Sequence, residues 1–241
     1  KLIMAGHSHW AGIKHKKGRQ DKERSKLFSK LSREITVAAK LGDQDPNTNP
    51  RLRAAIQLAK QANMPKENIN RAINKSKSIL NKNYQSLRYE GFGVSNTALI
   101  IETLTDNKNR TASKIRTVLQ KNGGRLGENG STSHLFYNCG VIQFNKEFFK
   151  DEQAMELAIN AGAKECVSNS QFHEITCEMK DFYKVKNMVE EKVDQLSYSA
   201  IEWRCYNNIE LSEDNKSKAL IMLNNLDEID DVQNIYINCK F

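Results

Sequence analysis

The chain reads DKERSKLFSKLSREITVAAK from residue 21 to residue 40, and this stretch carries two stripes at helical spacing. An apolar stripe recurs at intervals of four, four and three residues, and it consists of Leu27, Leu31, Ile35 and Ala38. A cationic stripe recurs at four, four, three and seven, and it consists of Lys22, Lys26, Lys30, Arg33 and Lys40. Such spacing predicts a helix that packs along one face and is positive along the adjacent face.

Two further helices are predicted after this one. Asn49 is a typical N-cap, Pro50 suits the first helical position, and apolar residues follow at helical spacing. Pro65 ends that helix and begins a third. We therefore expect a three-helix bundle over residues 21–78, preceded by a basic arm over residues 1–20.

The charge of the chain is divided unequally between this region and the rest. The formal net charge is +8 over 241 residues. Residues 1–78 hold 18 Lys and Arg against 6 Asp and Glu, which gives +12, whereas the remaining 163 residues hold 19 against 23, which gives −4. Because neutralising phosphates releases condensed counterions, such a basic region is typical of nucleic-acid binding. The alternative is a solvated basic face that serves solubility.

The cations of the arm and of the bundle are the candidate phosphate contacts. Trp10 is a candidate for stacking on an unpaired base, or else it packs the arm onto the helices. His7, His9 and His15 have no acidic or thiol companions nearby that would indicate a metal site or a catalytic pair. The predicted phosphate contacts are Lys14, Lys16, Lys17, Arg19, Lys22, Lys26, Lys30, Arg33, Arg51, Arg53, Lys60, Lys66 and Arg71.

The composition and the motifs exclude several classes of protein. Hydrophobic residues make up 39% of the chain and charged residues 27%. The sequence has no run of about 18 apolar residues, which is the length that would span a membrane. The glycine-rich stretch 123–132 lacks the ending of a Walker phosphate loop and precedes a strand. Neither GxSxG nor HExxH occurs, and five Cys form no CxxC pair. We therefore predict a cytoplasmic, non-enzymatic protein without metal or cofactor; a nuclease that uses the arm histidines is the remote alternative.

The rest of the chain alternates strands and helices, which predicts an α+β fold. Strands are expected near 97–105, 135–144, 172–178, 200–206 and 232–239, with helices near 109–122, 152–161, 181–192 and 212–226 and a linker over 76–88. The order of these elements favours one α+β domain over residues 79–135 plus 207–241, with a second inserted at 136–206. A serial arrangement is the alternative.

The inserted unit is acidic. Residues 136–205 hold 12 Asp and Glu against 8 Lys and Arg. We therefore expect this unit to contact a basic protein, or simply to be solvated, and not to lie on nucleic acid.

Ordered motifs along the chain resemble the YebC family, which includes probable transcriptional regulators of bacteria and a mitochondrial translational activator. The resemblance implies that both α+β domains are ferredoxin-like. His9 stands where the family usually has lysine, and Phe92-Gly93-Val94-Ser95-Asn96 replaces a glycine- and proline-rich turn. The motifs are Gly6-His7-Ser8-His9-Trp10, Ile13-Lys14-His15-Lys16-Lys17, Arg33-Glu34-Ile35-Thr36-Val37-Ala38-Ala39, Asn49-Pro50-Arg51-Leu52-Arg53, Ala62-Asn63-Met64-Pro65-Lys66-Glu67-Asn68-Ile69, Tyr89-Glu90-Gly91, Thr105-Asp106-Asn107, Asn109-Arg110-Thr111 and Gly123-Gly124-Arg125-Leu126-Gly127.

Together, these observations predict a regulator of gene expression that binds nucleic acid through its phosphate backbone. The family leaves two targets open, ribosomal RNA in translational activation or duplex DNA at promoters. Trp10, and the lack of an obvious helix with base-reading side chains, favour RNA at the ribosome.

Overall fold

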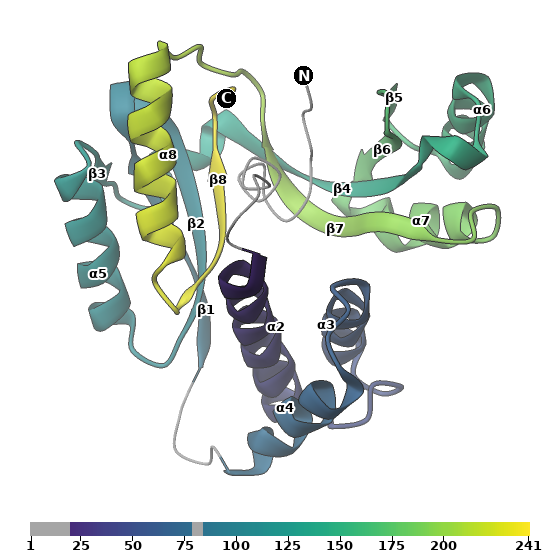
Figure 1. The fold of residues 1–241 in the computed structure, drawn as a ribbon, viewed down its shortest axis with the longest axis horizontal. Coiled ribbons are helices and arrows are strands. Elements are labelled where there is room, and N and C mark those ends of the chain that lie inside the picture. Colours follow the sequence, from purple (N-terminus) through teal and green to yellow (C-terminus); the bar gives the residue numbers. More distant parts are fainter. Residues whose placement is uncertain (1–19, 79–83) are drawn as a thin grey trace.

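The computed structural model describes residues 20–78 and 84–241, which form a helical bundle and two α+β units (Figure 1). The bundle lies at the bottom of this view, one α+β unit at the left, and the other at the right. The predicted α+β class is confirmed by two separate four-stranded antiparallel sheets with helices packed on them. The domain boundaries proposed from the sequence stay a prediction.

The bundle consists of α2 (Gln20–Leu41), α3 (Pro50–Gln61) and α4 (Lys66–Ser78). The predicted Asn49 cap is confirmed, since its side chain accepts a hydrogen bond from Leu52 N at 3.0 Å and donates one to the Ala38 carbonyl at 2.8 Å. This one side chain therefore begins α3 and ties it to α2. The apolar stripe of α2 packs into a cluster with Leu52, Ala55 and other apolar residues of α3 and α4.

The first sheet has the strand order β3-β1-β2-β8, and α5 and α8 lie side by side on one of its faces (Figure 1). Ile101, Ile115 and Met222 are fully buried between this sheet and these helices. The elements are β1 (Gln85–Phe92), β2 (Ala98–Thr105), α5 (Lys108–Lys121), β3 (Arg125–Leu126), α8 (Glu213–Asp227) and β8 (Val232–Ile237).

The second sheet has the order β5-β6-β4-β7, and its chain segment lies between β3 and α8 in the sequence. Phe144, Ile175 and Val185 are buried between this sheet and its two helices. The elements are β4 (Phe136–Asn145), α6 (Asp151–Ala161), β5 (Glu165–Ser168), β6 (Phe172–Glu178), α7 (Phe182–Glu190) and β7 (Leu196–Cys205). Short 3-10 turns at Val94–Asn96, Ser133–Leu135, Lys146–Phe148 and Met179–Asp181 complete the described elements.

The two α+β units share an apolar cluster and a carboxylate. Ala98, Ile100, Phe136 and Tyr236 are buried together, with Trp203 and Cys205 packed against them. Glu102 accepts hydrogen bonds from Trp203 Nε1 and Asn234 Nδ2, both at 3.0 Å. These contacts join the two units into one block.

The structure corrects three predictions about elements. The expected linker over residues 76–88 is wrong at both ends, because α4 extends to Ser78 and β1 begins at Gln85. The sequence of β1, QSLRYEGF, holds few apolar residues, but all eight of its residues pair with β2. Strand β5 was missed because it is four residues long, and β7 begins at Leu196, four residues before the predicted start.

Backbone N–H groups at the end of the glycine-rich stretch bind a carboxylate of the protein itself, that of Glu90 in β1. Glu90 Oε2 accepts hydrogen bonds from the backbone N–H groups of Thr132 at 2.7 Å and Ser133 at 2.8 Å. Burial raises the pKa of Glu90, but the N–H donors of Thr132, Gly130 and Ser133 outweigh it and leave that pKa below its ordinary value. The amides that converge here therefore bind the protein's own anion.

We predict that Glu90→Ala lowers the free energy of unfolding by about 2–3 kcal/mol, because it leaves buried N–H donors without an acceptor. Urea unfolding at neutral pH measures the effect. Glu128→Ala, which removes an exposed carboxylate from the same loop, is the matched control and should change stability by less than about 0.5 kcal/mol. Equal losses in the two variants would contradict the assigned role of Glu90.

Candidate nucleic-acid interface

The structure places the predicted site residues in different surroundings. Outside the described residues lie the phosphate candidates Lys14, Lys16, Lys17 and Arg19 and the stacking candidate Trp10. Lys22 is placed on α2 by its backbone alone. The other predicted cations contact carboxylates of the first α+β unit, pair with Glu34 of α2 in the case of Arg51, or face solvent on α3 and α4.

The lysines of the α2 stripe meet carboxylates at the end of α8. Lys30 Nζ lies 2.6 Å from Asp227 Oδ1 and donates to the Gln233 carbonyl at 3.2 Å. Lys26 Nζ lies 3.1 Å from Asp227 Oδ2 and 3.2 Å from Glu228 Oε1. The side chains of Lys26 and Lys30 retain only 19% and 15% of their exposure. These two cations therefore hold the bundle against the first α+β unit.

Arg33 continues the stripe to Asp231, just before β8. Arg33 Nη1 lies 2.7 Å from Asp231 Oδ1, and the other carboxylate oxygen accepts from Thr111 Oγ1 at 2.8 Å and Arg110 Nη2 at 3.2 Å. Burial raises the pKa of the Asp231 carboxyl, but the hydrogen bonds from Thr111, Arg33 and Arg110 outweigh it and lower that pKa. Asp231 therefore stays ionised and links α2, α5 and β8.

Arg51 forms an ion pair inside the bundle. Its Nε lies 2.7 Å from Glu34 Oε1, and its Nη2 donates to Glu34 Oε2 at 3.2 Å and to Ser86 Oγ at 3.3 Å. This two-point contact fixes α3 to α2, and it leaves the Arg51 side chain 40% exposed at the edge of a cleft.

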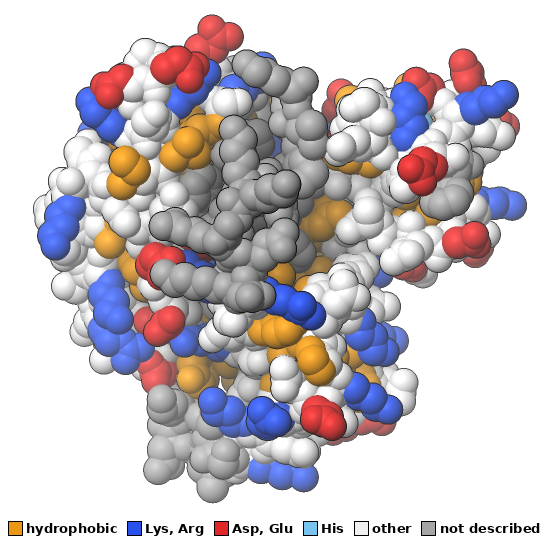
Figure 2. Space-filling view, viewed as in Figure 1, with side chains coloured by type: hydrophobic (Ala, Val, Ile, Leu, Met, Phe, Trp, Pro, Cys, Tyr) orange, Lys and Arg blue, Asp and Glu red, His pale blue; other side chains and the backbone are white. Residues whose placement is uncertain are grey.

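The exposed cations of α3 and α4, apart from Arg51, which pairs with Glu34, make up what we call the α3–α4 surface. Its members are Arg53, Lys60, Lys66, Arg71, Lys75 and Lys77, and all six are exposed. Glu67 is the one acidic residue in the two helices. Figure 2 shows Lys and Arg side chains gathered over this part of the molecule. Arg53 and Lys60, seven residues apart, project from one side of α3, about 10 Å apart along its axis.

Two members of this surface, Lys75 and Lys77, were not singled out from the sequence. They lie in the last turn of α4, where cations also complement the helix dipole. The position of Lys75, four residues after Arg71, is the signal that would have found it, because residues at that spacing share one face of a helix.

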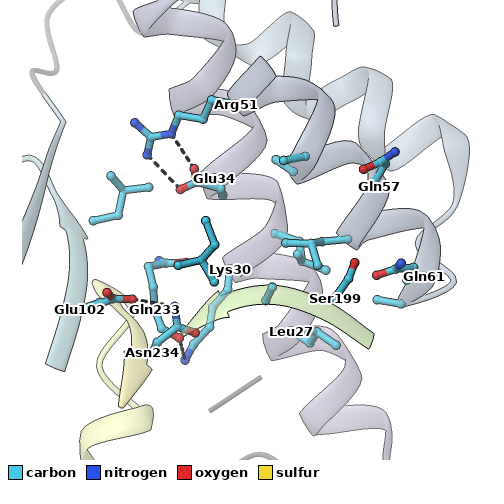
Figure 3. Close-up of a pocket in the computed structure, with 18 of the residues that line it drawn as sticks. Leu27, Lys30, Glu34, Arg51, Gln57, Gln61, Glu102, Ser199, Gln233 and Asn234 are labelled. Atoms are coloured by element: carbon cyan, nitrogen blue, oxygen red, sulfur yellow. Dashed lines mark hydrogen bonds and ion pairs between the residues drawn. The ribbon is translucent and has the colours of Figure 1, made fainter. Parts of the chain in front are cut away.

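A cleft of about 1340 Å³ opens where α2 and α3 face β1, β2, β8, β7 and α7. Figure 3 shows that charged side chains lining the cleft are paired: Arg51 contacts Glu34, and Lys30 contacts its own partners. Amide and hydroxyl groups, including Gln57, Gln61 and Ser199, alternate with apolar side chains between them. The cleft is therefore of mixed polarity, unlike the α3–α4 surface.

The described part of the chain shows no arrangement typical of metal catalysis. Over residues 20–78 and 84–241, no three His, Cys, Asp or Glu side chains come together as a metal site would require. His173 is fully buried, with Nδ1 2.7 Å from Ser168 Oγ and Nε2 2.9 Å from the Phe149 carbonyl. His7, His9 and His15 lie outside the described residues. In the same ranges, no helix has the length and apolar character needed to cross a bilayer.

The comparisons with known proteins cover nearly the whole chain. Residues 8–79 match the family model of the TACO1/YebC N-terminal domain, and residues 84–239 match that of the second and third domains. A probable transcriptional regulatory protein of Pelagibacter ubique (strain HTCC1062) is 54% identical over 238 residues, which are 99% of each chain. The crystal structure of a conserved hypothetical protein from Aquifex aeolicus superposes with a TM-score of 0.84 at 40% identity, over 97% of each chain.

Proposed function

The chain belongs to the TACO1/YebC family, and from this premise we propose that it is a non-enzymatic regulator of gene expression that binds the phosphate backbone of nucleic acid. We propose that residues 21–78 form the binding domain. The other two domains, residues 79–135 plus 207–241 and the inserted residues 136–206, are ferredoxin-like and orient it.

The α3–α4 surface is the observation that carries this proposal. Its six cations are exposed, and Glu67 is the one carboxylate in the two helices that bear them. A surface on which exposed cations outnumber carboxylates attracts a polyanion, and each phosphate contact releases counterions, which favours binding at moderate salt. The arm cations Lys14, Lys16, Lys17 and Arg19, with Lys22, would extend the same contact, and Trp10 would stack on a base.

We propose RNA of the ribosome as the target, in translational activation. The cations of the α3–α4 surface would contact phosphates, and such contacts suit recognition of the shape of an RNA.

Duplex DNA at promoters is the second candidate, for two reasons. The Pelagibacter relative carries the name of a transcriptional regulator. In addition, α4 exposes Asn70, Arg71 and Asn74 on neighbouring turns, and side chains of these types can read base edges in a major groove. These exposed side chains are the structural observation that favours this second candidate.

The acidic inserted unit is proposed to meet a basic protein. On α6, the apolar side chains of Met155 and Ile159 are 45% and 68% exposed, and Glu152 and Glu156 lie beside them. This combination suits an amphipathic cationic segment better than a phosphate backbone.

Sedimentation of a gently lysed extract through a sucrose gradient tests the choice of target. We expect the protein to migrate with ribosomal particles, to remain there after DNase and to leave them after RNase. Release by DNase from a DNA-containing fraction would instead support promoter binding. Migration at the top of the gradient under every condition would contradict both targets.

The absence of turnover is a separate prediction. Labelled RNA and labelled DNA should remain intact after incubation with the purified protein. Cleavage that His15→Ala abolishes would overturn the proposal of a binding protein and favour a nuclease.

A further inference from the structure

The bundle is held to the rest of the molecule by contacts of a different kind from those inside each unit. Its apolar cluster draws its members from α2, α3, α4 and the turn between α3 and α4, whereas the two α+β units share the cluster around Ile100 and Tyr236. By contrast, the described contacts from Lys26, Lys30 and Arg33 to the α8–β8 region are ion pairs and hydrogen bonds. Ion pairs weaken with ionic strength and exchange partners, while an apolar cluster does neither.

The carboxylates that contact α2 lie where negative charge is electrostatically unfavourable. Four of the five residues in the acidic segment, Asp227-Glu228-Ile229-Asp230-Asp231, are acidic, and the segment begins at the C-terminal residue of α8. The C-terminal end of a helix is the negative end of its dipole, and the last turn of α8 has no basic residue. The α2 cations therefore compensate a negative charge that α8 itself does not compensate.

The geometry resembles that of a cationic surface on a polyanion. The α2 cations lie four and three residues apart along one helix. Lys26 and Lys30 share the carboxylate of Asp227, and Arg33 contacts that of Asp231, at 2.6 to 3.1 Å. They are not sealed from solvent, since 15% to 23% of each side chain remains exposed. Asp231 has further donors in Thr111 and Arg110, so it keeps hydrogen-bond partners when Arg33 leaves.

We propose that the acidic segment occupies a second phosphate-binding surface, formed by Lys26, Lys30 and Arg33 of α2, and that nucleic acid displaces it. The inference rests on the proposed function and adds its regulation. In the free protein, the carboxylates of the acidic segment hold the bundle against the first α+β unit. They also neutralise positive charge on α2 and so reduce the attraction of the bundle for polyanions. A nucleic acid that contacts the α3–α4 surface gains the α2 cations in exchange, because its phosphates are multivalent and release counterions.

Carboxyl footprinting with a carbodiimide and glycine ethyl ester, read by mass spectrometry, tests the exchange on the full chain. The probes are a single-stranded RNA and a DNA duplex of mixed sequence. We expect either probe that binds to raise the labelling of Asp227 and Asp231 toward that of Asp230, which is already exposed. Acetylation of Lys26 and Lys30 should not rise, because phosphates replace the carboxylates.

A paired variant measures the competition. Asp227→Asn with Glu228→Gln removes two of the carboxylates that compete with phosphates, so it should raise the affinity for the probe. The expected rise is only about threefold to tenfold, because each partly exposed ion pair contributes little. The matched control, Glu191→Gln with Asp194→Asn, removes the same charge at exposed positions after α7 and should leave the affinity within about twofold.

The outcomes separate the two proposals. Binding with unchanged labelling of Asp227 and Asp231, or an equal rise in affinity in both paired variants, overturns the exchange and leaves the proposed function standing. Absence of binding to both probes contradicts the proposed function, and the exchange fails with it.

Discussion

Reversing two cations of α4, Lys66→Glu with Arg71→Glu, is expected to weaken nucleic-acid binding by about tenfold or more in the range of 50 to 200 mM salt. Each reversal removes one phosphate contact and adds a repulsion, so the slope of log affinity against log salt should become shallower by about two. Both side chains are exposed. Fluorescence anisotropy with labelled RNA and labelled duplex measures the effect.

The choice of these positions separates binding from stability. Lys66 is the first residue of α4, where a carboxylate complements the helix dipole better than an ammonium group does. The thermal midpoint should therefore stay within about 2 °C of that of the wild type. Lys180→Glu with Lys184→Glu, at exposed positions of the inserted unit, changes the net charge equally and is the control. An equal loss of affinity in the control would show that net charge, and not the α3–α4 surface, governs binding.

Asp231→Ala should have the largest effect on stability, a loss of about 2–4 kcal/mol in the free energy of unfolding. The side chain is 6% exposed and accepts from Arg33, Arg110 and Thr111 at 2.7 to 3.2 Å. Alanine leaves these donors without that acceptor at a point where three elements meet. Urea unfolding at neutral pH gives the value. Asp230→Ala removes the exposed neighbouring carboxylate and should cost less than about 0.5 kcal/mol.

The same carboxyl makes stability depend on pH with a definite sign. The pKa of Asp231 in the folded protein lies below its ordinary value of 3.8. The stability that the ionised Asp231 contributes is therefore complete above pH 3.8, and it is lost as the pH falls through the lower pKa that this carboxyl has in the folded protein. The stability difference between the wild type and Asp231→Ala should stay constant near neutral pH and shrink below about pH 4. A difference that grows toward acid would contradict this ion pairing.

The α2 stripe shows how far the sequence could predict this structure. Periodicity located the helix and both of its stripes, because both depend on residues within a few turns. It could not tell that Lys26, Lys30 and Arg33 meet the acidic segment, since that segment lies about 200 residues away along the chain. Four acids in five residues at the end of α8 were the available signal. The role of these cations toward phosphate stays a proposal.

The strands show a second limit. Strand β2 was predicted to within one residue, because it opens with four consecutive buried apolar residues, Ala98 to Ile101. Strand β1 has a mixed sequence, and its stability comes from pairing with β2 on one side and β3 on the other. Pairing of this kind is a tertiary contact, so it leaves a weak local pattern.

The salt dependence of binding by the full wild-type chain tests the central claim most directly. The affinity for a single-stranded RNA and for a DNA duplex would be measured between about 50 and 200 mM KCl. If about six phosphates are bound, the slope of log affinity against log salt should be about −4 to −5. A slope near zero, with affinity retained, would contradict binding through the phosphate backbone.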